Sequence, residues 1–216
     1  MTPPLVFTHG WKDSADAWSA VVDELGKLDQ RSGFDDSLVT WNLPYHGGAA
    51  ALEQPERPAR AELLTLLDAH VDRAGTPAVL VGHSLGGYLS LAYTLEHPDK
   101  VAGLVLIATG PGFKKAEPRE AWNKWARKKA DPTTPGQELV VLQHDAAVIE
   151  GLGNIVAPTL VIQGARDTQY DGARKVFTSR IAGSEAVVLE GGGHNVHRKM
   201  PETVASLIAD FMKRRV

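Results

Sequence analysis

Runs of apolar residues alternate with amphipathic stretches along this chain, and the alternation predicts strands followed by helices. Short apolar runs typical of buried strands occupy 5–8, 38–41, 78–81, 101–108, 159–163 and 186–189. Apolar positions at helical spacing predict helices over 14–28, 59–74, 85–96, 171–181 and 201–214. This order predicts an α/β fold with about six mostly parallel strands flanked by helices, and a ligand site at the carboxyl ends of the strands.

One segment interrupts the alternation of strands and helices. Between Gly110 and Ile155 the pattern contains no strand, and it predicts helices over 118–130 and 136–150 that are separated by Asp-Pro-Thr-Thr-Pro. An insertion after the carboxyl end of a strand would lie over the ligand site. We therefore interpret about 111–150 as a short helical cap within a single domain spanning 1–216, the alternative being a crossover helix with solvated loops.

The composition is typical of one globular domain, and it limits the kinds of partner that the protein is expected to bind. Hydrophobic residues make up 43% of the 216 residues and charged residues 23%, and no linker-like stretch divides the chain. A net charge of −3 supplies no field for nucleic acid. No apolar stretch has the length of a membrane span and no signal peptide opens the chain, so we expect a cytoplasmic protein. The absence of cysteine excludes disulfides, thiolate catalysis and cysteine metal ligands.

The turn between the strand near residue 80 and the next helix carries Gly82-His83-Ser84-Leu85-Gly86. A sharp turn from strand to helix holds Ser84 in a strained conformation, and side chains at 82 and 86 would collide across it. Such a turn exposes the serine hydroxyl and aims the amide of Leu85 at an attacked carbonyl oxygen. The motif predicts a nucleophilic serine, whereas the same pentapeptide also occurs in loops without catalytic function.

A nucleophilic serine needs a base, and the base needs a carboxylate. His194 follows the last predicted strand in a glycine-rich turn, and Asp167 follows the strand 159–163, so both are expected at the edge that holds Ser84. His9 and His83 are alternative bases, although each is expected to orient the loops beside the serine. Asp171 is an alternative acid, although it is expected to begin a helix as its N-cap.

A metal site is not expected. His197 lies three residues after His194, but no third ligand has suitable spacing.

Five stretches together resemble the α/β-hydrolase superfamily, and the resemblance covers nearly the whole chain. They are His9-Gly10-Trp11, Leu43-Pro44-Tyr45-His46-Gly47, Gly82 to Gly87, Ala157 to Gly164 with Asp167, and Gly193-His194. The resemblance implies that Ser84, Asp167 and His194 form a catalytic triad, in the order along the chain that this superfamily uses. It also implies an oxyanion hole formed by the backbone amides of Trp11 and Leu85, and a reduced cap over 111–150. No metal or organic cofactor is implied.

The sequence departs from the family pattern at three points. Members usually have two further strands before the first strand predicted here, so a smaller sheet is expected. Asn42 stands where an aspartate is common, and Tyr45 replaces the first glycine of its turn. None of these changes touches the three predicted catalytic residues.

The identity of the nucleophile restricts the reaction. A serine that displaced a group from saturated carbon would form a stable ether, so Ser84 indicates chemistry at a carbonyl. We predict a serine hydrolase that acts on a small-molecule acyl compound: an ester, a lactone or a thioester. Carbon–carbon cleavage is an alternative. The segments around His194 and Tyr170 are also similar to the menaquinone-pathway synthase of this fold, a carbon–oxygen lyase that eliminates pyruvate. A non-catalytic ligand-binding protein on the same scaffold is the third hypothesis.

The predicted cap gives hints about the substrate. Trp122 and Trp125 share a helical face and, with His83, are candidate pocket residues, although such a pair often serves only in packing. The stretch 114–131 carries seven basic and three acidic side chains. This excess of positive charge is typical of a solvated helix face, and it would also attract an anionic substrate.

Overall fold

Six parallel strands form one sheet, in the order β2-β1-β3-β4-β5-β6, within the residues that the computed structural model describes, 2–29 and 38–216. The strands are β1 (Leu5–Thr8), β2 (Leu38–Trp41), β3 (Ala78–His83), β4 (Val101–Ile107), β5 (Thr159–Gly164) and β6 (Glu185–Leu189). In the middle of the sheet, Val81 lies opposite Phe7 of β1 and Val105 of β4. The predicted α/β fold is confirmed, and every neighbouring pair of strands is parallel.

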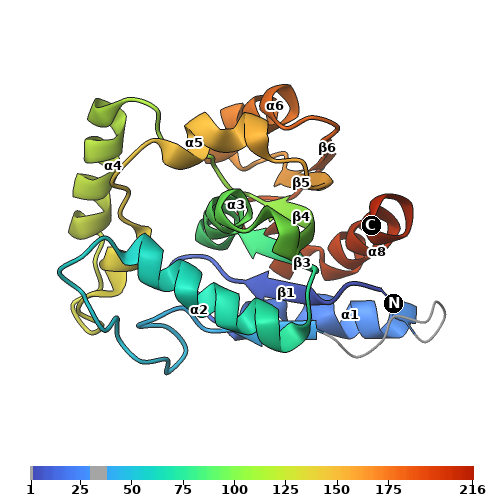
Figure 1. Ribbon diagram of the computed structural model, residues 1–216, viewed down its shortest axis with the longest axis horizontal. Coiled ribbons are helices and arrows are strands. Elements are labelled where there is room, and N and C mark those ends of the chain that lie inside the picture. Colours follow the sequence, from blue (N-terminus) through green and yellow to red (C-terminus); the bar gives the residue numbers. More distant parts are fainter. Residues whose placement is uncertain (1, 30–37) are drawn as a thin grey trace.

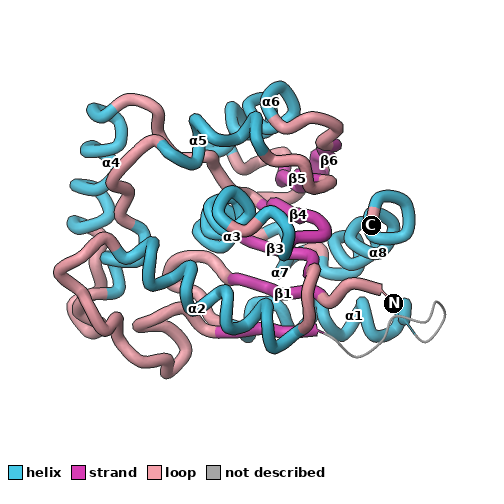
Figure 2. The backbone as a smooth tube through the Cα atoms, in the orientation of Figure 1, coloured by secondary structure: helices cyan, strands magenta, loops and turns pink. Residues whose placement is uncertain are grey.

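Helices cover both faces of this sheet (Figure 1). The α-helices outside 111–150 are α1 (Ser19–Asp29), α2 (Ala59–Ala74), α3 (Leu85–Glu96), α6 (Asp171–Arg180), α7 (Val196–Lys199) and α8 (Pro201–Arg215). Short 3-10 helices are η1 (Ala15–Trp18), η2 (Pro98–Lys100), η3 (Gln137–Val141), η4 (Leu152–Asn154) and η5 (Thr168–Tyr170). In Figure 2 the strands lie between α1 and α8 on one side and α2 and α3 on the other.

Each strand contributes side chains to two hydrophobic cores, because successive side chains point to opposite faces of a sheet. Leu80 and Leu104 pack in the core that includes α2 and α3, whereas Val79 and Val105 pack in the core that includes α1 and α8. Burial on both faces explains why the central strands consist of continuous apolar residues.

The segment 111–150 lies at one end of the molecule and differs in part from its predicted structure. The first predicted helix is present as α4 (Ala116–Lys128), which stands apart from the sheet in Figure 1. The predicted helix over 136–150 is wrong, because the chain forms η3, an irregular stretch and the short α5 (Ala147–Gly151). The consecutive residues Val140, Val141 and Leu142 are all buried, which an amphipathic helix with one apolar face does not achieve.

The carboxyl ends of parallel strands lie at one edge of a sheet, so the turns that follow β1, β3, β5 and β6 meet there.

None of the helices in the described ranges combines the length and the apolar character needed to cross a membrane.

Candidate active site

Ser84 occupies a sharp turn between β3 and α3, with φ 51° and ψ −112°. Two glycines allow the backbone to come this close to its neighbours. A Cβ atom on Gly82 would lie 2.4 Å from the amide nitrogen of Gly87, and one on Gly86 would lie 2.1 Å from the carbonyl oxygen of Thr8. The collision at Gly86 is therefore with the end of β1, and it excludes any side chain at that position.

Two hydrogen bonds hold the strained backbone of Ser84. Its amide donates to the carbonyl oxygen of Ile107 at 2.9 Å, and the hydroxyl of Thr109 donates to its carbonyl oxygen at 2.5 Å. Ile107 is the last residue of β4, which lies beside β3 in the sheet, and Thr109 lies two residues beyond it. The neighbouring strand thus supports a conformation that costs energy in isolation.

His194 contacts Asp167 at the same edge of the sheet. The Nδ1 atom of His194 lies 2.9 Å from Oδ2 of Asp167, and the carboxylate is almost completely buried, with its side chain 3% exposed. Since a carboxylate only accepts hydrogen bonds, Nδ1 carries the proton and donates it. The turn that carries His194 crosses closely over β5, because a Cβ atom on Gly164 would lie 2.5 Å from the carbonyl carbon of Gly192. The other candidate acid, Asp171, is the first residue of α6.

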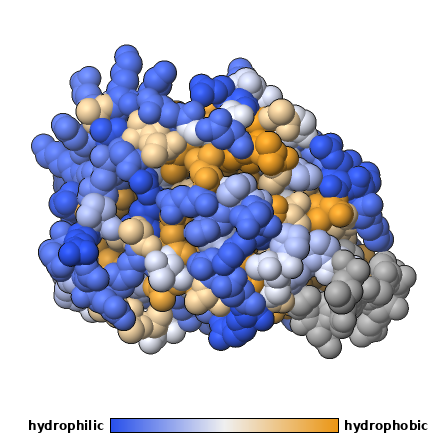
Figure 3. Space-filling model, viewed as in Figure 1, coloured by the Kyte–Doolittle hydropathy of each residue, from blue (hydrophilic) through white to orange (hydrophobic). Residues whose placement is uncertain are grey.

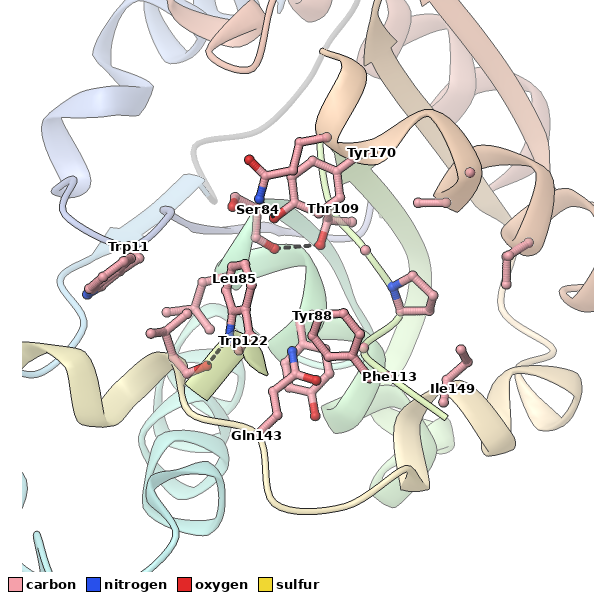
Figure 4. A pocket seen from close by; sticks show the side chains of 18 of the residues that line it. Trp11, Ser84, Leu85, Tyr88, Thr109, Phe113, Trp122, Gln143, Ile149 and Tyr170 are labelled. Atoms are coloured by element: carbon pink, nitrogen blue, oxygen red, sulfur yellow. Dashed lines mark hydrogen bonds between the residues drawn. The ribbon is translucent and has the colours of Figure 1, made fainter. Parts of the chain in front are cut away.

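A cavity of about 580 Å³ lies beside these residues (Figure 4). The turns after the strands contribute Trp11, Ser84, Leu85, Thr109, Tyr170 and His194 to its lining. The segment 111–150 contributes Phe113, Trp122, Trp125, Val141, Gln143 and Ile149. Most of this wall is aliphatic or aromatic, which suits an apolar ligand with few polar groups.

Both candidate pocket tryptophans line the cavity, where they also pack together. The ring centroids of Trp122 and Trp125 lie 4.9 Å apart, and Trp125 contacts the ring of Trp11 at 5.8 Å. Trp122 donates from its indole nitrogen to the carbonyl oxygen of Val141 at 3.1 Å. These contacts tie α4 to η3 and to the turn after β1.

The turn after β1 lies next to Ser84. A Cβ atom on Gly10 would lie 3.3 Å from the Cβ atom of Ser84, so Trp11 begins within reach of the serine. His9 secures this turn, because its Nδ1 donates to the carbonyl oxygen of Gly10 at 2.7 Å and its Nε2 accepts from the amide of Leu43 at 3.0 Å. Burial lowers the pKa of His9 to about 4, so its ring is neutral and both nitrogens are occupied.

His83 does not line the cavity, contrary to its expected position in the pocket. It is the last residue of β3, and its ring lies between those of His194 and His197, with centroids at 4.8 and 4.1 Å. Its Nε2 atom donates to the carbonyl oxygen of His194 at 3.0 Å. Complete burial lowers the pKa of His83 well below its usual range, so it supports the loop of His194 as a neutral side chain.

Tyr170 is a site residue to which the sequence assigned no role. Its ring stacks on that of His194, with centroids 5.3 Å apart and an angle of 15° between the planes. Burial raises the pKa of its hydroxyl, and the nearby side chain of Ser84 opposes that effect. The signals in the sequence were its position three residues after Asp167 and the similarity of this segment to the menaquinone-pathway synthase.

One group of possible metal ligands occurs among the described residues. Ligand atoms of Asp13, His83 and His197 lie within 4.8 Å of one another. Two imidazoles that bind one tetrahedral ion have centroids about 5 Å apart, whereas these two rings are 4.1 Å apart. Asp13 is also paired with Arg198. The geometry therefore fits packed neutral rings better than a metal centre.

Comparison with known proteins places this chain in a family. The chain is 36% identical over 167 residues to a pimeloyl-[acyl-carrier protein] methyl ester esterase from Chromobacterium violaceum, covering 77% of this chain and 57% of the esterase. It is 24% identical over 254 residues to a 2-succinyl-6-hydroxy-2,4-cyclohexadiene-1-carboxylate synthase from Escherichia coli O1:K1 / APEC, covering 98% of this chain and 94% of the synthase. The chain thus spans little more than half the length of the esterase.

Solved structures have the same fold. The structure of MenH from S. aureus matches with a TM-score of 0.79 at 18% identity, covering 100% of this chain and 95% of that chain. The family model described as alpha/beta hydrolase fold matches residues 3–131, which is more than half of the sequence. With its parallel sheet and its serine at a strained turn, this chain belongs to the alpha/beta hydrolase fold family.

Proposed function

We propose that the protein is a serine hydrolase that cleaves carboxylic esters of small molecules through an acyl-enzyme on Ser84. The observation that carries this proposal is the 2.9 Å contact between His194 and Asp167, beside a cavity that both His194 and Ser84 line. A serine hydroxyl is a weak nucleophile at neutral pH, and a histidine held by a carboxylate is the base that activates it.

The reaction follows from the protonation of His194. Asp167 accepts the Nδ1 proton, which leaves the lone pair of Nε2 as the base. The hydroxyl oxygen of Ser84 attacks the ester carbonyl while Nε2 takes its proton, and the imidazolium then gives this proton to the departing alcohol. Water activated by the same nitrogen attacks the acyl-enzyme, which releases the carboxylic acid and returns the proton to Ser84.

Two backbone amides are proposed to stabilise the negative oxygen of the tetrahedral intermediate. The amide of Leu85 belongs to the first residue of α3, where no intrahelical acceptor is in reach. The amide of Trp11 follows Gly10, which lies close to Ser84. Removal of one such donor typically lowers kcat by about 10²- to 10³-fold.

The substrate is proposed to combine an apolar acyl group with an anionic carrier or substituent. The cavity wall is largely apolar, and none of the basic side chains of 114–131 lines it. These side chains belong to α4 and its flanks, at the left of Figure 1, where the face in Figure 3 is mostly hydrophilic. The esterase from Chromobacterium violaceum carries a name that specifies a methyl ester of an acyl group on an acyl-carrier protein. An ester of this general kind fits both features.

The role of the basic segment can be tested by reversing charge at two exposed positions. Lys128→Glu together with Lys129→Glu should raise KM for anionic esters and leave KM for neutral esters unchanged, because the charges act on encounter and binding. Equal effects on both classes of ester would contradict this assignment.

A second candidate is a carbon–oxygen lyase that removes a proton with His194 and Ser84 and releases pyruvate. It is favoured by the similarity to the synthase, which extends over 98% of this chain. Arg60 is also near the site, since it donates to the hydroxyl of Tyr88 at 3.3 Å. Its guanidinium is paired with Asp145, however, so it offers no free charge to an anionic substrate. Pyruvate release from the synthase's substrate would favour this candidate.

Ester turnover separates the proposals. Wild-type protein should hydrolyse p-nitrophenyl butyrate, and Ser84→Ala should lower kcat by at least about 10⁴-fold, because the triad acts as a unit. Ser179→Ala, which removes an exposed serine on α6, is the matched control and should retain full activity. Turnover that survives in the Ser84 variant would overturn the proposed function.

A further inference from the structure

Four aromatic side chains line the cavity as one connected row. Trp11 comes from the turn after β1, Trp122 and Trp125 come from α4, and Phe113 precedes that helix. The ring centroids of Trp11 and Trp125 lie 5.8 Å apart, and those of Trp125 and Trp122 lie 4.9 Å apart. Phe113 completes the row, with its centroid 5.9 Å from that of Trp122. We call these four residues the aromatic row.

Two rings of the aromatic row are fixed through their polar edges. The indole nitrogen of Trp11 donates to the carbonyl oxygen of Gln137 at 3.2 Å. The indole nitrogen of Trp122 donates to the carbonyl oxygen of Val141 at 3.1 Å. Both acceptors belong to η3. Because the protein itself satisfies these N–H groups, the parts of the two rings that face the cavity offer apolar and π contacts to a ligand.

Trp125 leaves part of its ring uncovered. Its exposed fraction is 41%, although it packs against Trp11 and Trp122. Its indole nitrogen forms no hydrogen bond with any residue that the structure describes, so packing against other rings is what holds it. A tryptophan that lines a cavity and is still partly exposed provides surface that a ligand can cover.

The charges around the aromatic row indicate that its ligand group is neutral. Among the lining residues whose side chains the structure describes, none is Lys, Arg, Asp or Glu. Aromatic faces also attract quaternary ammonium groups through cation–π contacts. However, the stretch 114–131, which carries Trp122 and Trp125, has seven basic and three acidic side chains. This excess of positive charge opposes the binding of a cation there.

We propose that the aromatic row binds a neutral aromatic ring on the acyl chain of the substrate. This inference rests on the proposed ester hydrolase and names its substrate class as esters of arylalkanoic acids. Aromatic rings prefer tilted or offset contacts with centroids about 4.5–7 Å apart. The contacts within the row fall in this range, so a substrate ring extends the row by one member. In Figure 4, Trp122 and Phe113 lie below Ser84 in the view, which separates ring recognition from the chemistry.

The test compares phenyl esters with cyclohexyl esters of the same carbon skeleton. The substrates are ethyl 3-phenylpropanoate and ethyl 3-cyclohexylpropanoate, together with the matching pair of 5-substituted pentanoates. Burial of apolar area alone favours the cyclohexyl esters, because the saturated ring is larger and more apolar. Contacts between aromatic rings reverse this order. In the pair that is turned over faster, wild type should prefer the phenyl ester by about fivefold in kcat/KM, mainly through KM.

Substitution of Trp125 assigns the preference to the aromatic row. Trp125→Leu should reduce the preference to about twofold or less, whereas Trp125→Phe, which keeps a ring, should retain most of it. Glu120→Leu places the same new side chain at an exposed position of α4 and is the matched control, so it should keep the full preference. A fivefold preference that persists in Trp125→Leu would overturn the assignment to the aromatic row.

Binding of the same esters to Ser84→Ala, measured by calorimetry, reads the preference without turnover. If wild type hydrolyses none of the esters but the phenyl esters bind about fivefold tighter, the proposed hydrolase fails and the role of the aromatic row stands. If the esters are hydrolysed and the cyclohexyl esters are bound and turned over equally well or better, the role of the aromatic row fails and the hydrolase stands. Tighter binding of ethyl 4-(trimethylammonio)butanoate than of ethyl 5,5-dimethylhexanoate, its neutral counterpart, would overturn the assignment to a neutral ring.

Discussion

Acid should destabilise the protein through histidines that are buried as neutral rings, and His197 allows this effect to be isolated. Its side chain is 0% exposed and packs between Trp18 and His83, with ring centroids at 4.8 and 4.1 Å. Neither ring nitrogen has a hydrogen-bond partner in the described part of the chain. Burial lowers its pKa from 6.5 to about 4.

The direction of the effect follows from where the proton binds. Between pH 6.5 and about pH 4 the unfolded chain protonates this histidine and the folded protein does not. The contribution of His197 to stability is therefore complete above about pH 6.5 and is lost as the pH falls. A pKa difference of this size lowers the free energy of unfolding by about 2 kcal/mol at about pH 5, and by about 3 kcal/mol at about pH 4.

The perturbation is His197→Phe, which keeps an aromatic ring and removes the ionisable group. Urea unfolding followed by circular dichroism at several pH values gives the free energy of unfolding of each protein. The stability of the variant relative to wild type should rise by about 2 kcal/mol from pH 7 to pH 5. Lys199→Gln, on the exposed side of the same short helix, should follow wild type throughout. A stability difference between the His197 variant and wild type that does not change with pH would refute the reasoning.

Three further substitutions test the site and its support. Asp167→Asn should lower kcat by about 10³- to 10⁴-fold with an unchanged circular dichroism spectrum, because His194 loses the acceptor that fixes its tautomer; full activity would contradict this role. Gly86→Ala should cost at least about 2 kcal/mol in the free energy of unfolding, since the new Cβ would meet the carbonyl oxygen of Thr8, and an unchanged melting temperature would argue against that contact. Tyr170→Phe keeps the ring stack and removes a hydroxyl that competes with His194 for the Ser84 side chain, so labelling by a fluorophosphonate should accelerate about fivefold; slower labelling would mean that the hydroxyl assists the reaction.

The strands were predictable because each is a short apolar run between helical patterns, and parallel order follows from that alternation. The same logic brings Asp167 and His194 to the edge that carries Ser84, since all three follow carboxyl ends of strands. The pattern failed over 136–150, where consecutive buried residues were mistaken for a helix. Burial there depends on contacts with α4 and with other parts of the chain. The periodicity of the segment's own sequence does not indicate those contacts.

Position along a strand explains why His83 lies behind the site. It follows Val79 and Val81 at intervals of two, and both of these pack in the core with α1 and α8. The alternation of side chains therefore placed His83 on that face, although its chain neighbour Ser84 reaches the cavity. The contact between Tyr170 and His194 was beyond local reasoning, because it joins two residues that are distant in sequence.

The central claim is that Ser84 is an activated nucleophile, and intact-protein mass spectrometry after treatment with a fluorophosphonate tests it most directly. A single adduct on wild-type protein, absent from Ser84→Ala and greatly slowed in Asp167→Asn, is the predicted result. An unmodified wild-type protein that remains folded, or an adduct that persists in the Ser84→Ala variant, would contradict the claim.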